Sequence, residues 1–137
     1  WPLSPDTVQE VINSQKAEIK RRIKVLRGGR PLPSIRGRTV ILVDDGLAMG
    51  STMRAAILLS KKHGAARVVA AVPVAGRRAE RTVRRLADEL VVLEQPPNFR
   101  AVAQVYRNWY DVGDDEVMEL LESGACKESI QTSGRGR

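Results

Sequence analysis

The sequence predicts an α/β fold with three layers, in which a mainly parallel sheet carries helices on both faces. Three apolar runs rich in β-branched residues, at 39–43, 67–74 and 90–93, are typical of buried strands. Amphipathic segments at 53–63 and 77–88 separate these runs. Strands that alternate with helices pair in parallel through right-handed crossovers, so the chain order itself predicts the sheet.

A long helix is predicted before the first strand. Ser4 provides a capping hydroxyl, Pro5 suits the first helical position, and Gly28-Gly29 ends the helix. Its apolar residues recur at helical spacing: Val8, Val11, Ile12, Ile19, Ile23 and Leu26. The basic residues that gather toward its end indicate a solvated face, with a nucleic-acid contact as the less favoured interpretation.

The composition limits the class of protein. Within 137 residues, 42% are hydrophobic and 4% aromatic, so one core built from Val, Leu, Ile and Ala is expected. The formal net charge of +7 favours anionic partners of any kind. Cys126 is the single cysteine, which excludes an internal disulfide. With no apolar run of about 20 residues and no signal peptide, we expect a cytoplasmic protein without membrane contact.

The stretch that follows the first predicted strand carries the chemistry. Asp44 and Asp45 arrive at the carboxyl end of the strand, a loop with glycines at Gly46 and Gly50 follows, and Ser51-Thr52 opens a helix. The free amides and dipole of a helix N-terminus favour a phosphate. Paired carboxylates suit sugar hydroxyls or a hydrated Mg²⁺. A phosphorylated sugar would satisfy both halves of this loop.

Residues 40–53 resemble the phosphoribosyl-pyrophosphate (PRPP) signature of type I phosphoribosyltransferases. Two further segments, Val72-Pro73-Val74-Ala75 and Phe99-Arg100-Ala101-Val102, are similar to bacterial phosphoribosyltransferase domains. The resemblance runs from about Val8 to about Leu121 and covers roughly two thirds of a family domain. It implies N-terminal strands and an early pyrophosphate-binding loop that this sequence does not show, and hence a domain truncated at its N-terminus.

The resemblance implies a reaction and roles for named residues. The protein would bind PRPP or a nucleotide 5′-phosphate, transfer the phosphoribosyl group to a nitrogenous base and release pyrophosphate, as a transferase of nucleotide metabolism. Asp44 and Asp45 would hold the ribose hydroxyls and favour positive charge at C1′. Mg²⁺ would be bound through PRPP, with Asp44 and Asp45 as candidate ligands, and would neutralise the charge of the leaving pyrophosphate. The 5′-phosphate would rest on the loop residues Ala48, Met49, Gly50, Ser51 and Thr52.

Other residues are candidates for the rest of the ligand. Arg27 and Arg30 lie in a basic connector that could meet pyrophosphate, although a plain linker is an equal interpretation. Val74, Phe99 and Tyr106 are candidates for a base pocket, although aromatic residues pack cores equally well. Met49 departs from the family pattern, which usually has threonine there, and a thioether cannot donate to phosphate.

Several alternatives stay open from the sequence. A module that binds PRPP or a nucleotide without turnover, or an enzyme relic, agrees with Met49 and the short domain. Nucleic-acid binding through the basic helices is a further alternative. A Walker A loop would need a lysine before Ser51-Thr52, and a phosphorelay receiver would need an aspartate at the end of the 67–74 strand, and neither is present.

The expected organisation is one domain at 1–123, with an N-terminal helix within 1–29 and an α/β core at 39–123. Residues 124–137 lack periodicity and are predicted to be a disordered tail. A three-stranded sheet leaves an edge bare, and bare apolar edges attract partners. We therefore expect a homo-oligomer in which another subunit covers this edge.

Overall fold

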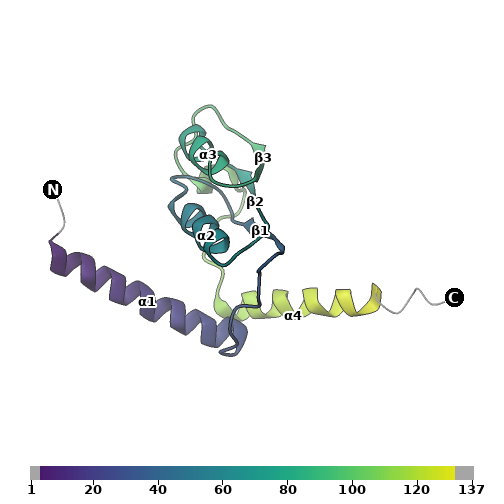
Figure 1. Cartoon of the computed structure of the whole chain (residues 1–137). Coiled ribbons are helices and arrows are strands. Elements are labelled where there is room, and N and C mark those ends of the chain that lie inside the picture. The colour runs from purple at the N-terminus through teal and green to yellow at the C-terminus, as the bar shows by residue number, and fades with distance from the viewer. Residues whose placement is uncertain (1–3, 132–137) are drawn as a thin grey trace. The chain divides into compact units, whose positions relative to one another are not determined.

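A computed structural model describes residues 4–131, with side chains described as far as residue 124. The chain forms two compact units: residues 33–109 make one, and the segments at either end of the chain make the other (Figure 1). In the described part of the chain, no helix combines the length and the apolar character that crossing a bilayer requires.

The unit at 33–109 is built on a three-stranded parallel sheet. The strands β1 (Thr39–Val43), β2 (Arg67–Val74) and β3 (Glu89–Glu94) lie in the order β1-β2-β3. Thr39 is opposite Arg67 in the first pair, and Ala70 is opposite Leu90 in the second. The predicted parallel α/β arrangement is confirmed. Because all strands point the same way, the residues that follow β1 and β2 emerge at one edge of the sheet.

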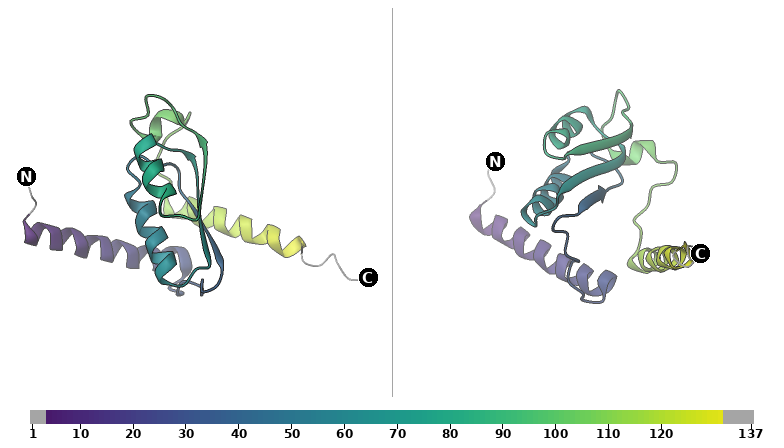
Figure 2. Two further views of the ribbon diagram at one scale, coloured as in Figure 1. Left: turned by 45° about the horizontal axis from the view of Figure 1, so that its top comes forward. Right: turned by 45° about the vertical axis from the view of Figure 1, so that its right-hand side comes forward.

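The helices of this unit, α2 (Ser51–Lys62) and α3 (Arg77–Arg84), lie on one face of the sheet (Figure 2). The sequence predicted helices on both faces. Two successive right-handed crossovers that step in the same direction, from β1 to β2 to β3, place both helices on the same side, so residues 33–109 supply one helical layer.

Alternation along the strands separates a packed face from an open one. The packed face and the helices form a core of fully or almost fully buried side chains, among them Ile57, Val68, Val74 and Val83. The other face carries Ile41, Val43 and Leu93, which are 64%, 76% and 80% exposed. The core is therefore aliphatic, as the composition predicts, and it is small.

Asp88 joins the start of β2 to the start of β3. Its carboxylate accepts a hydrogen bond from the Val68 amide at 2.7 Å, and its own amide donates to the Val68 carbonyl at 2.9 Å. Lys61 of α2 approaches the same carboxylate at 3.3 Å. The Val68 amide and, second, Lys61 lower the pKa of Asp88. The helix α3 ends at Arg84, short of the predicted end at residue 88, and Asp88 lies outside the helix and pairs with Val68.

We expect Asp88→Asn to lower the thermal unfolding temperature at pH 7, and we expect this loss to shrink as the pH falls below the ordinary pKa of aspartate. A carboxyl with a depressed pKa contributes stability above its unfolded pKa, and that contribution is lost as the pH falls through the folded pKa. Unfolding scans between pH 7 and pH 3 measure this, with Asp111→Asn at an exposed site as the control. An equal loss at both pH values would contradict the charge-based account.

A segment after β3 crosses the carboxyl edge of the sheet. It contains η1 (Val102–Val105), a short 3₁₀ helix. The hydroxyl of Tyr106 donates to the Asp45 carbonyl at 2.8 Å. The segment is thus fixed to the loop that follows β1.

The second unit contains α1 (Pro5–Arg27) and α4 (Asp114–Gln131). Ser4 caps α1 by accepting a hydrogen bond from the Thr7 amide, and Gly28 ends it in the left-handed conformation at φ 58°, as predicted. Arg21 of α1 pairs with Asp114 of α4. The helix α4 continues to Gln131 and so overlaps the tail predicted at 124–137, while residues 132–137 lie outside the described part.

Candidate active site

The loop between β1 and α2 is anchored at its middle. The Leu47 amide donates to the Val74 carbonyl at 2.9 Å, and the Leu47 carbonyl accepts from the Gly76 amide at 2.9 Å. Leu47 forms a parallel bridge with Ala75 and is 1% exposed. This single buried residue holds the loop to the end of β2, while its neighbours on both sides stay accessible.

Two carboxylates occupy the first half of the loop. Asp44 is half-buried and accepts a hydrogen bond from the Asp45 amide at 3.0 Å, while Asp45 is exposed. Partial burial and, second, the charge of Asp44 raise the pKa of Asp45, although a hydrogen bond from the Gly46 amide opposes this. A ligand that brings hydroxyl donors or positive charge would relieve this repulsion.

The second half of the loop opens α2 without a side-chain cap. Gly50 is the N-cap, in the left-handed conformation at φ 77°, and no side chain bonds to the free amides. The first hydrogen bond of the helix runs from the Arg54 amide to the Gly50 carbonyl, so the amides before Arg54 lack helical partners. No acidic residue lies in the first turn, so the positive end of the helix dipole stays available to an anion.

Both halves of the loop line one cavity of about 430 Å³, within the range of small-molecule sites. This cavity is lined by all the loop residues that the sequence analysis named as candidate site residues: Asp44, Asp45, Ala48, Met49, Gly50, Ser51 and Thr52. Met49 is 84% exposed, so its side chain packs against no core and can reach a ligand.

Val102 lines the same cavity and is a residue that the sequence analysis missed. It lies against Gly46, where a Cβ atom would come within 2.8 Å of both Val102 and Val74 side-chain carbons. Only glycine fits between these two valines. The family-like Phe99–Val102 segment was a signal that this region matters, but local sequence could not pair it with Gly46.

The predicted base-pocket residues have three different surroundings. Val74 is 1% exposed and its carbonyl is bonded to Leu47, so it supports the loop and is closed to a ligand. Phe99 is half-buried beside Gly76, whose Cβ would lie 3.0 Å from the Phe99 ring. Tyr106 is 37% exposed and holds the loop through the Asp45 carbonyl. Phe99 and Tyr106 remain candidates.

Arg27 and Arg30 belong to the other compact unit. There the Arg30 guanidinium donates to the Arg27 carbonyl at 3.1 Å. Their contact with pyrophosphate stays a prediction.

The sequence matches a family model and two curated relatives. The model of the phosphoribosyl transferase domain matches residues 3–108. Two Mycobacterium tuberculosis proteins, from strains CDC 1551 / Oshkosh and H37Rv, are each named "Putative phosphoribosyl transferase" and are 38% identical over 120 residues. That alignment covers 88% of this chain but 27% of each relative, so the chain spans about a quarter of their length.

A solved structure is similar as well. The crystal structure of TT1426 from Thermus thermophilus superimposes with a TM-score of 0.72 at 34% identity, over 88% of this chain and 58% of that one. The family match covers most of the chain, including the whole loop with its carboxylates and uncapped helix. The chain therefore belongs to the phosphoribosyl transferase domain family.

Proposed function

We propose that the cavity between Asp44 and Thr52 binds PRPP and that the domain transfers its phosphoribosyl group to a nitrogenous base, with release of pyrophosphate. Membership of the family supports the reaction class. The observation that carries the proposal is the shared cavity, in which two carboxylates and an uncapped helix N-terminus face one ligand-sized space.

The two ends of a phosphoribosyl group match the two halves of this cavity. The 5′-phosphate accepts hydrogen bonds from the amides that open α2 and from the Ser51 and Thr52 hydroxyls. The carboxylates of Asp44 and Asp45 accept from the ribose hydroxyls and favour the positive charge that develops at C1′. Positioning and electrostatics then supply the catalysis, and no covalent intermediate is needed.

We expect Mg²⁺ to bind at this site together with PRPP, which would supply some of its oxygen ligands. Among the described residues, no three acidic, histidine or cysteine side chains are grouped to hold a metal ion. Mg²⁺ commonly binds one or two carboxylates and completes its shell with water and phosphate oxygens. Asp44 and Asp45 provide that partial set, and Mg²⁺ would neutralise the charge of the departing pyrophosphate.

Calorimetric titration of the full chain with PRPP and Mg²⁺ tests binding, and a panel of free bases assayed for pyrophosphate release tests transfer. Saturable binding together with base-dependent release supports the proposal. Binding without release from any base would favour a module that binds PRPP without turnover, an outcome that the exposed Met49 thioether makes worth testing. Absence of binding would contradict both.

We expect Met49→Thr to tighten PRPP binding about tenfold, because a hydroxyl at this position adds a hydrogen bond to a charged phosphate. Met49 is exposed in the cavity, so the change costs no core packing. Calorimetry measures the dissociation constant. Met49→Val is the matched control, since valine has the shape of threonine without the hydroxyl; equal affinity of the two variants would show that the loop does not contact phosphate.

A further inference from the structure

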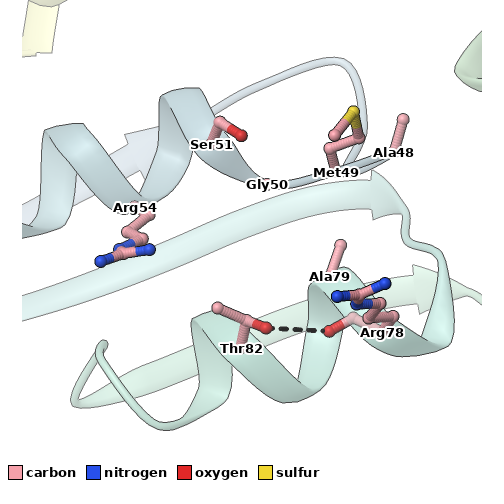
Figure 3. A pocket seen from close by; sticks show the side chains of 8 residues that line it. All are labelled: Ala48, Met49, Gly50, Ser51, Arg54, Arg78, Ala79 and Thr82. Carbon is pink, nitrogen blue, oxygen red and sulfur yellow. Dashed lines mark hydrogen bonds between the residues drawn. The ribbon is translucent and has the colours of Figure 1, made fainter. Parts of the chain in front are cut away.

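A second cavity, of about 310 Å³, adjoins the first between the N-terminal turn of α2 and helix α3 (Figure 3). It shares the loop residues 48–51 with the cavity just described. Its other lining residues are Arg54 of α2 together with Arg78, Ala79 and Thr82 of α3. The carboxylates Asp44 and Asp45 line only the first cavity, so the two sides of the loop differ in charge.

The walls of this second cavity are fixed by the core. Ala79 and Val83 of α3 are 1% and 0% exposed. They pack so closely on the loop that a Cβ at Gly50 would lie 3.4 Å from Val83 Cγ2 and 3.5 Å from Ala79 Cβ. The turn that begins α2 and the helix α3 are thus held together, and Arg54 and Arg78 extend from two elements whose separation is set.

The two arginines bring uncompensated positive charge. Among residues 4–124, whose side chains are described, neither guanidinium forms an ion pair, whereas Arg84 on the same helix pairs with Glu80. No acidic residue lines the cavity. The Thr82 hydroxyl donates to the Arg78 carbonyl at 3.1 Å, as Figure 3 shows, and its oxygen remains an acceptor. The Ser51 hydroxyl completes the polar lining.

We propose that this cavity is a second anion site, which binds a phosphate group between Arg54 and Arg78. Guanidinium groups form charge-assisted, often bidentate, hydrogen bonds with phosphate oxygens. The uncapped N-terminus of α2 adds to the favourable potential. The phosphate is either free orthophosphate or a phosphate on a molecule that extends beyond the PRPP cavity. The site shares residues 48–51 and the N-terminus of α2 with the PRPP cavity, whereas Arg54, Arg78 and Thr82 line the second cavity and not the first.

Titration of the ¹⁵N-labelled full chain with orthophosphate tests this site by nuclear magnetic resonance. We expect the amide signals of α3 around Arg78 and Thr82 to shift with saturation. In the double variant Arg54→Gln with Arg78→Gln, these shifts should require at least about tenfold more phosphate. Arg81→Gln removes one charge from the same helix outside the cavity and is the control, with expected behaviour like that of the parent protein.

Repeating the titration with PRPP and Mg²⁺ present distinguishes the two sources. Persistence of the α3 shifts on adding orthophosphate shows that free phosphate occupies a separate site. Shifts of α3 caused by PRPP with Mg²⁺ alone, and lost both in the double arginine variant and in Asp44→Asn with Asp45→Asn, show a phosphate attached to the ligand of the first cavity. Unshifted α3 signals in the parent protein, or equal shifts in the double arginine variant, would overturn the proposal.

Discussion

Replacing Asp44 and Asp45 together by asparagine is expected to abolish the heat protection that PRPP with Mg²⁺ gives to the protein. A ligand present at about 100 times its dissociation constant stabilises the folded state by about 2.7 kcal/mol, which is several degrees in unfolding temperature. Asparagine has nearly the shape of aspartate, so the substitution removes the negative charge and leaves the loop in place. Thermal unfolding with and without ligand measures the effect.

The same variant has an internal check on folding. Partial desolvation and, second, the charge of the neighbouring Asp44 raise the pKa of Asp45, which means that the ionised form costs folding stability. The ligand-free double variant should therefore unfold at a temperature no lower than the parent protein at pH 7. Loss of protection cannot then be ascribed to misfolding, and a double variant that PRPP still protects would defeat the assignment of these carboxylates.

The charge on Asp45 also makes ligand protection of the parent protein depend on pH. A raised folded pKa means that Asp45 takes up its proton at a higher pH than an ordinary aspartate. Protection by PRPP and Mg²⁺ should weaken as the pH falls through that value, because a neutral carboxyl attracts neither the cation nor the developing charge at C1′.

The parallel strands and the loop at the edge of the sheet were predictable because their signals are local. A β-branched run, two acids, glycines and a helix start follow one another within residues 39–53, and each obeys a short-range rule. The end of α1 at Gly28 was predictable for the same reason. Local rules therefore located the loop residues that line the first cavity, with the exception of Leu47.

The rest of the site depends on contacts between distant parts of the chain. Val102 beside Gly46 and the Tyr106 hydroxyl on the Asp45 carbonyl join segments about sixty residues apart, and no periodicity encodes such a pairing. Arg54 and Arg78 appear in the sequence as two ordinary surface arginines, and only the packing of α3 on Gly50 brings them to one cavity. Tertiary packing, which sequence pattern does not specify, decides these relationships.

Gly46→Ala is expected to have the second large effect, because it fills the narrowest contact in the loop. A methyl group at this position would lie 2.8 Å from Val74 Cγ1 and 2.8 Å from Val102 Cγ2. Val74 belongs to the core at 1% exposure and cannot move away, so the loop or η1 must shift. Overpacking of this kind costs about 1–3 kcal/mol of folding stability. Displacing the loop should also weaken PRPP binding, because Asp45 and Leu47 flank the substituted residue.

A control variant and a double variant test whether the effects of Gly46→Ala come from the steric clash or from the loss of a flexible glycine. Gly113→Ala is the control, since a Cβ there meets no atom within 4 Å and the unfolding temperature should stay close to that of the parent. Adding Val102→Ala to Gly46→Ala removes one of the two clashing side chains and should recover part of both stability and PRPP binding. If Gly46→Ala alone leaves unfolding and ligand protection unchanged, the close packing of η1 on the loop is not what shapes this cavity.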